Sequence, residues 1–128
     1  MELKPGLEGR AETAVELADT ALEVGSGALR VYATPCLAAL MEGAACDCLE
    51  GYLPEGQTSV GTSLHLKHTS ATPVGMEVYA VAVLKAVDGR KLTFEITAFD
   101  EAGQIGSAEH ERFIVNAERF LEKTYEKI

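Results

Sequence analysis

Apolar residues recur along this chain with two different periods. Between Thr34 and Tyr52 they recur every three or four positions, which is the period of a helix with one buried face. Thr34-Pro35 is typical of a helix start, with threonine as the N-cap and proline tolerated in the first turn. Gly51 and Pro54 end the segment. The pattern predicts one long, alanine-rich helix that can lie close to a sheet.

Most of the remaining chain follows the two-residue period of strands. One strand is expected over residues 7–17, before a break at residues 25–27. Four more are expected at residues 58–68, 76–87, 92–99 and 104–115, with Asp88-Gly89 as a hairpin signal between two of them. A strict alternation in the first of these four places Val60, Thr62, Leu64, Leu66 and His68 on one face, and Gly61, Ser63, His65 and Lys67 on the other.

A last helix is expected over residues 117–127, with Asn116 as its N-cap and with Phe120, Leu121 and Tyr125 packed on the body of the protein. The order of elements predicts an α+β fold: one long central helix wrapped by a curved antiparallel sheet of about five strands, plus a short C-terminal helix. We expect the last four strands to form a meander and residues 1–128 to form a single domain. Because such a sheet leaves one helix flank open, we also expect a homodimer.

Composition and charge exclude several functions. The chain is 47% apolar, and its 11 basic and 20 acidic residues give a net charge of −9, without the Lys and Arg cluster that nucleic-acid binding needs. The longest apolar run, Val78 to Leu84, is too short for a membrane-spanning helix. Three cysteines and no evident signal peptide predict a cytoplasmic protein with reduced thiols. An anionic ligand would need a local basic patch, for which the candidates are Lys67, Lys85, Arg90, Lys91 and Arg112.

Three side chains from different segments could together serve acyl transfer. Glu42 lies inside the long helix among apolar neighbours, where a carboxylate is costly to bury without a partner. His68 ends a strand, and imidazole has the free pKa that suits proton transfer near neutral pH. Thr34 stands at a helix start, where N–H groups and the dipole would stabilise an oxyanion. Singly, each has an ordinary structural explanation: a solvated Glu, a core histidine and an N-cap.

Other chemical signals are weaker. His65 lies on the strand face opposite to His68, and His110 sits between two glutamates. The Cys46-Asp47-Cys48 segment lacks a second pair that would complete a zinc site, so no metal is expected. Cys36, at the helix start, could have a lowered pKa, although a buried structural thiol is commoner there. The Gly-x-Ser-x-Gly motif of α/β-hydrolases is absent from the sequence.

Four segments together resemble the fluoroacetyl-CoA-thioesterase-like branch of the hotdog superfamily, over roughly residues 7 to 120. They are Tyr32-Ala33-Thr34-Pro35 through Glu42, Val60-Gly61-Thr62, His68 through Gly75, and His110-Glu111-Arg112-Phe113. The resemblance implies a homodimeric hotdog thioesterase that hydrolyses a small acyl-CoA at the subunit interface. It implies Thr34 as the hydroxyl, Glu42 as the carboxylate and His68 as the imidazole. It also implies that the Gly61 backbone approaches the thioester and that Arg112 lies near the site.

In the expected mechanism, His68 is the general base and Glu42 either orients it or positions water. Thr34 is either the nucleophile or a hydrogen-bond donor. We expect the start of the helix, Pro35 and Cys36 included, to bind the substrate and to hold the oxyanion with its N–H groups. Coenzyme A is part of the substrate, and no cofactor is expected.

Two features keep the specificity and the reaction open. Residues 23–28 lack the aromatic residue that gates the pocket of the specialised fluoroacetyl-CoA enzyme, so a broader or different acyl group is expected. The alternatives to hydrolysis are a non-catalytic hotdog protein that binds an acyl-CoA or related small ligand, and a dehydratase or hydratase. The last would need an Asp–His pair, for which the helix offers only Asp47.

Overall fold

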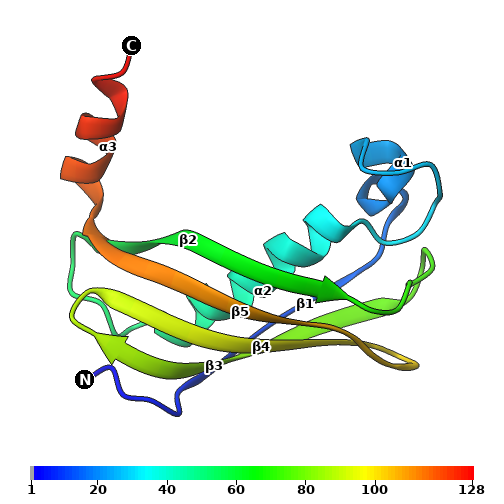
Figure 1. Cartoon of the computed structure of the whole chain (residues 1–128), viewed down its shortest axis with the longest axis horizontal. Helices are drawn as coiled ribbons and strands as arrows, with labels where there is room; N and C mark the ends of the chain where they lie inside the picture. The colour runs from blue at the N-terminus through cyan, green and yellow to red at the C-terminus, as the bar shows by residue number, and fades with distance from the viewer. Residues whose placement is uncertain (1) are drawn as a thin grey trace.

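A five-stranded antiparallel sheet curls around one long helix in the computed structural model, which describes residues 2–128 (Figure 1). This confirms the expected α+β architecture. Two short helical segments before the long helix were not expected. The elements in chain order are β1 (Glu8–Ala14), η1 (Leu17–Asp19), α1 (Ala21–Val24), α2 (Thr34–Leu49), β2 (Gln57–His68), β3 (Glu77–Asp88), β4 (Lys91–Asp100), β5 (Gly103–Asn116) and α3 (Ala117–Tyr125).

The strand order differs from the expected four-strand meander. The sheet runs β1-β3-β4-β5-β2, so only β3, β4 and β5 follow one another through hairpins, while β2 pairs with β5 at the far edge. The segment after β2 is bound elsewhere: the Tyr32 N–H donates to the Thr72 carbonyl (2.9 Å), and Val31 forms a β-bridge with Pro73. These bonds hold the connection beside the start of α2, so it does not form a tight turn.

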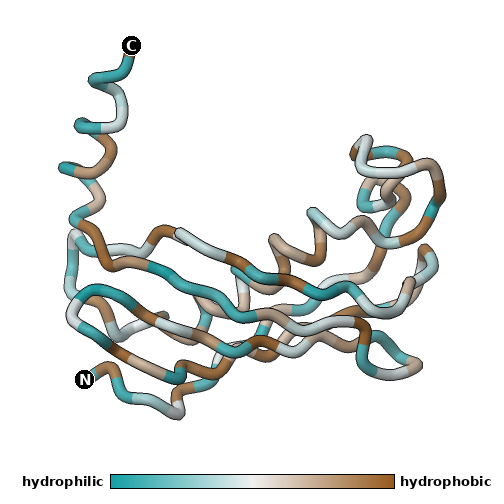
Figure 2. Tube along the Cα trace, in the orientation of Figure 1, coloured by the Kyte–Doolittle hydropathy of each residue, from teal (hydrophilic) through white to brown (hydrophobic). Residues whose placement is uncertain are grey.

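Helix α2 packs on the concave face of the sheet. Brown and teal segments alternate along the strands in Figure 2, as expected for a sheet with one buried face. Leu84, Phe94 and Ile96 are fully or almost fully buried on that face. The helix contributes its own buried residues, which are Leu37, Met41, Ala44, Ala45, Cys48 and Leu49. The prediction of an alanine-rich helix lying close to a sheet is confirmed.

The two edges of the sheet are finished differently. At the β1 edge, the Arg10 N–H donates to Asp47 Oδ2 of α2 (2.8 Å), so a helix side chain satisfies one backbone donor of this edge. At the other edge, β2 extends over 12 residues and, within residues 2–128, pairs with β5 alone. An open strand edge of this length presents N–H and C=O groups that can pair with another strand.

Helix α3 projects away from the sheet, as Figure 1 shows. Asn116 caps it as expected, because its Oδ1 accepts the Arg119 N–H (3.0 Å). The expectation that its apolar residues pack on the body is wrong within one chain: Phe120, Leu121 and Tyr125 are 43%, 57% and 61% exposed. The physical reason is that β5 runs on to the cap residue and the helix leaves from there. Within the described chain, no helix combines the length and the apolarity needed to cross a bilayer.

Gly9 in β1 sets the distance between α2 and the sheet. Substitution of Gly9 by alanine should therefore cost more stability than the same substitution at Gly43. A Cβ at Gly9 would overlap the backbone of Ala44 and Cys48, whereas a Cβ at Gly43 would make an ordinary 3.6 Å contact with Ala11. Gly9→Ala should lower the free energy of unfolding by about 1–3 kcal/mol or more. Gly43→Ala, the matched control, should leave it unchanged or raise it by up to about 1 kcal/mol through helix propensity. Urea denaturation measures both, and equal effects would contradict this packing.

Candidate active site

Thr34 and His68 meet where α2 begins and β2 ends. Thr34 Oγ1 lies 2.8 Å from His68 Nδ1, a hydrogen-bond distance. The expected N-cap role of Thr34 is wrong: Ala33 is the cap residue, and Thr34 is the first residue of the helix. Its hydroxyl therefore makes no cap hydrogen bond and faces the imidazole. Thr34 is exposed and His68 is partly buried, so the pair is accessible from one side.

The surroundings of His68 favour its neutral form. Burial lowers the pKa of the imidazole below its usual 6.5, and a backbone interaction with Ser70 offsets part of this effect. The Nε2 atom is buried and lacks a well-formed hydrogen bond. Nδ1 is thus the ring atom that faces a reactive group. In its unprotonated form it can accept the proton of the Thr34 hydroxyl.

The start of α2 offers fewer free N–H groups than expected. Pro35 has none, and the Cys36 N–H donates to the Ala33 carbonyl (3.0 Å). Among residues 2–128, the Thr34 N–H has no hydrogen-bond acceptor of good geometry. The possibility of a lowered Cys36 pKa is also corrected: burial, and then Asp19, raise the pKa of this thiol. Thr34 is therefore the residue at this helix end that can donate to an oxyanion.

Glu42 lies in a second cluster, eight residues and about 12 Å further along the helix. Its Oε2 accepts a hydrogen bond from Arg112 Nη1 (3.1 Å), and the side chain is still 43% exposed. A Cβ at Gly61 would overlap this carboxylate oxygen, so the carboxylate lies directly against the Gly61 backbone. The structure brings Glu42, Gly61 and Arg112 together, and it does not bring Glu42 to Thr34 or His68 within one chain.

A β-bulge in β2 explains how Gly61 comes to face Glu42. The register shifts between Gly61, paired with Arg112, and Ser63, paired with Glu111, which leaves Thr62 as an extra residue. The strict alternation that placed Gly61 on the face opposite to His68 is therefore wrong. Ser59 and Gly61 before the bulge share the helix-facing side with Leu64, Leu66 and His68 after it, because their partners on β5 alternate without interruption.

His110 is a site residue that the sequence reading underrated. Its side chain is 1% exposed, Nδ1 lies 2.7 Å from the Ser63 carbonyl, and Nε2 lies 3.1 Å from Arg112 Nη1. A carbonyl can only accept, so Nδ1 carries the proton and Nε2 accepts from Arg112. Burial is the main reason that the pKa of His110 is lowered, and Arg112 lowers it further. The signal in the sequence was that His110 shares a strand face with Arg112.

Arg112 itself is anchored on three sides. Its Nε donates to Ser59 Oγ (2.8 Å) and its Nη2 to the Ser59 carbonyl (3.1 Å), in addition to the bonds of Nη1 with Glu42 and His110. The side chain is only 7% exposed, and a guanidinium so buried needs this set of acceptors. Arg112 therefore holds the Glu42 carboxylate in one place.

A cavity of about 270 Å³ adjoins the Thr34–His68 pair. Tyr32 and Ser70 line it, together with Ala21 and Ser26 from the segment that includes α1. Ser26 belongs to residues 23–28, where the sequence has no aromatic side chain. The cavity wall on this side is therefore made of small residues.

Comparisons with known proteins identify the family of this chain. The family model described as fluoroacetyl-CoA-specific thioesterase matches residues 15–118. The fluoroacetyl-CoA thioesterase of Streptantibioticus cattleyicolor is 39% identical over 97 residues, which cover 76% of this chain and 70% of the relative. This chain belongs to the fluoroacetyl-CoA-specific thioesterase family.

Solved structures match this chain over nearly its whole length. A structure of the fluoroacetyl-CoA thioesterase matches with a TM-score of 0.93 at 30% identity, covering 100% of this chain and 99% of that one. A mutant of that enzyme in complex with fluoroacetate and CoA matches with a TM-score of 0.87 at 32% identity, covering 92% and 99%. A hot-dog-like protein from Thermanaerovibrio acidaminovorans, 24% identical with a TM-score of 0.88, covers 98% and 93% and shares the fold. The expected hotdog fold is confirmed.

The two neutral histidines predict how stability changes with pH. Because folding lowers the pKa of both His68 and His110, the unfolded chain binds more protons between their folded pKa values and 6.5. Their contribution to stability is complete above pH 6.5 and is lost as the pH falls through the folded values. NMR titration of the ring nitrogens should give both midpoints below 6.5, and urea midpoints should decrease from pH 7.5 to 5.5. A midpoint above 6.5 for either ring would contradict burial as the dominant cause.

Proposed function

We propose that this protein hydrolyses a small acyl-CoA to the free acid and CoA, in a homodimer that builds each active site from two subunits. One subunit supplies Thr34 and His68, and the other supplies Glu42, Gly61 and Arg112. The observation that carries the proposal is the 2.8 Å contact between the exposed Thr34 hydroxyl and the imidazole of His68. Because this chain belongs to a thioesterase family, we take a thioester as the bond that is cleaved.

The open edge of β2 supports the shared site. If two copies pair antiparallel along β2, a twofold axis places the last part of one strand beside the first part of the other. His68 ends β2, and Gly61 lies seven residues earlier, next to Glu42. The pairing therefore brings His68 of one copy toward Glu42 of the other, which a single chain keeps apart.

In the proposed reaction, neutral His68 accepts a proton at Nδ1 as the thioester carbonyl is attacked. The proton comes from Thr34 if its Oγ1 is the nucleophile, forming an acyl-threonine ester that water then hydrolyses. It comes from water if Thr34 only donates a hydrogen bond. The thiolate of CoA leaves with the returned proton. In this scheme the Thr34 N–H and the Gly61 backbone would meet the carbonyl oxygen, and losing one such donor typically costs about 100- to 1000-fold in rate.

The geometry favours one of the two roles considered for Glu42. His68 Nδ1 already faces Thr34 and Nε2 is buried, so neither ring nitrogen is open to a carboxylate. Glu42 is instead half-exposed and fixed by Arg112. We therefore assign Glu42 to positioning the hydrolytic water, with Arg112 as the residue that positions Glu42.

A small acyl group fits the cavity beside Thr34. Its volume of about 270 Å³ is below the usual range for drug-sized ligands. The related enzyme is named for fluoroacetyl-CoA, whose acyl group has two carbons. Because Ser26 lines the cavity where no aromatic gate is present, we propose that unfluorinated short acyl groups are also accepted. The reaction needs no cofactor in this scheme. The three free cysteines support a location in the cytoplasm, where thiols stay reduced.

The two alternative functions make different predictions. A binding protein without catalysis would release no thiol from an acyl-CoA that it binds. A hydratase of the kind considered would pair an Asp with the histidine, but Asp47 accepts the Arg10 N–H at the β1 edge. The contact that His68 does make, with a threonine hydroxyl, favours hydrolysis.

His68→Ala should lower kcat/KM for acetyl-CoA by about 100- to 10,000-fold because it removes the general base. A thiol-reactive dye measures CoA release. His65→Ala is the matched control, since His65 faces the opposite side of β2 and should keep normal turnover. Hydrolysis by His68→Ala at the wild-type rate would reject His68 as the base. Quenching the reaction of a slow substrate and measuring the mass of the intact protein then shows whether a covalent acyl-enzyme forms, and the same measurement on Thr34→Ala shows whether Thr34 carries the acyl group.

A mixed dimer tests whether the site is shared. Thr34→Ala and Glu42→Gln should each be nearly inactive as homodimers. In a heterodimer purified through two different tags, one site carries both substitutions and the other carries neither, so about half of the wild-type turnover should return. If Thr34 and Glu42 of the same chain formed the site, the heterodimer would stay inactive.

A further inference from the structure

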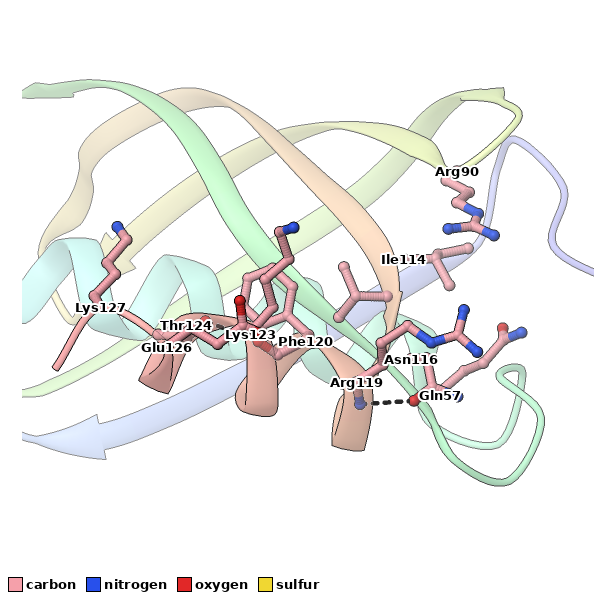
Figure 3. A pocket seen from close by; sticks show the side chains of 11 residues that line it. Gln57, Arg90, Ile114, Asn116, Arg119, Phe120, Lys123, Thr124, Glu126 and Lys127 are labelled. Atoms are coloured by element: carbon pink, nitrogen blue, oxygen red, sulfur yellow. Dashed lines mark hydrogen bonds between the residues drawn. The ribbon is translucent and has the colours of Figure 1, made fainter.

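A cavity of about 660 Å³ lies outside the candidate site, between α3 and the adjoining ends of the sheet. Four cationic side chains line it: Arg90, Arg119, Lys123 and Lys127. Ile114 and Phe120 supply an apolar part of the wall. In Figure 3 the guanidinium groups of Arg90 and Arg119 lie at one end of this cavity and Lys127 lies at the other. We call it the α3 cavity.

The charge of the α3 cavity contrasts with that of the protein. The chain carries −9 overall and has 11 Lys and Arg residues, of which four line this cavity. Among residues 2–128, none of the four has a carboxylate within salt-bridge distance, whereas Lys4, Arg10, Lys85, Lys91 and Arg112 all do. One carboxylate, Glu126, also lines the cavity. Unpaired cations gathered on one cavity of an acidic protein indicate an anionic ligand.

Backbone bonds fix the elements that carry these cations. The Ile114 N–H donates to the Arg90 carbonyl (2.9 Å), which holds the β3–β4 turn against β5. The Ala117 N–H donates to the Gly56 carbonyl (2.9 Å), which ties the start of α3 to the loop before β2. Arg90 and Arg119 thus come from two anchored segments and converge on one cavity. Guanidinium groups bind phosphate oxygens in pairs, and an aromatic ring such as Phe120 can stack on a base.

We propose that the α3 cavity binds the adenosine 3′-phosphate 5′-diphosphate part of CoA. This inference rests on the proposed thioesterase function and names the residues that hold the far end of its substrate. Gln57, on the cavity wall, is four residues from Gly61, a distance of about 13 Å along the strand. The pantetheine arm of CoA covers such a span, so the thioester reaches the Gly61 backbone while the phosphates lie among the four cations.

Direct binding tests the inference without catalysis. Isothermal titration of the full-length dimer with adenosine 3′,5′-bisphosphate should show saturable binding that weakens as NaCl rises. Arg119→Ala, Arg90→Ala and Lys123→Ala should each raise Kd by roughly 3- to 10-fold. Lys85→Ala, the matched control, removes a cation that pairs with Glu95 and should change Kd less than twofold. Equal effects in control and cavity variants would overturn the assignment.

Two further ligands identify what the cavity recognises. ADP, which lacks the 3′-phosphate, should bind more weakly than adenosine 3′,5′-bisphosphate, and inorganic phosphate more weakly still. Inorganic phosphate binding as tightly as the bisphosphate would mean a simple anion site and would reject the nucleotide. No detectable binding of the bisphosphate would reject the inference altogether.

A kinetic comparison separates this inference from the proposed function. For Arg119→Ala, KM for acetyl-CoA should rise roughly 3- to 10-fold with kcat retained, whereas kinetics with acetyl-pantetheine, which has no nucleotide, should match the wild type. Unchanged KM values for acetyl-CoA would overturn the inference and leave the thioesterase standing. If the wild type hydrolyses neither acetyl-CoA nor fluoroacetyl-CoA, the proposed function fails, and a positive bisphosphate titration would still assign the cavity.

Discussion

The close contact between α2 and the sheet determines where every candidate residue lies. At Gly9 the backbone of β1 meets the helix with no room for a side chain, so the helix axis has a fixed distance and direction. Thr34 and Glu42 are on that one rigid helix, eight residues apart. They therefore cannot adjust to one another within a chain, and each takes its partner from the strand that passes beside it. Thr34 meets the end of β2, and Glu42 lies against the β2 backbone at Gly61 and bonds to Arg112 of β5.

The periodicity of the sequence was sufficient to predict the main helices and strands. It was insufficient to predict the order of the strands in the sheet. All five strands and both longer helices follow from local patterns, and Asn116 caps α3 as its side chain suggests. The place of β2 beside β5 could not be predicted from local patterns, because it rests on pairing between residues far apart in sequence, such as Gln57 with Asn116. The outward course of α3 could not be predicted either. The sequence of α3 indicates an amphipathic helix, and only the structure shows that one chain leaves its apolar face uncovered.

The sequence supplied candidate residues for the site, and the structure brings only some of them together. Thr34, Glu42 and His68 were selected because hydroxyl, carboxylate and imidazole suit acyl transfer, and the structure does place Thr34 against His68. The bulge at Thr62 defeated the alternation rule, since one extra residue reverses every face before it. His110 was underrated because its neighbours in sequence, Glu109 and Glu111, are acidic. Burial in a strand is decided by alternate positions, and there His110 stands with Arg112.

A comparison of the buried His110 with the partly buried His68 shows why only His68 suits the role of base. Burial lowers the pKa of both, so each is neutral near pH 7. Both nitrogens of His110 are committed, Nδ1 to a carbonyl and Nε2 to the Arg112 guanidinium, so a proton on Nε2 would have to displace a cation. His68 instead presents Nδ1 to a hydroxyl, a group that can give up its proton as a bond forms. His110 thus stabilises the arginine that fixes Glu42, while His68 is left free to accept the proton.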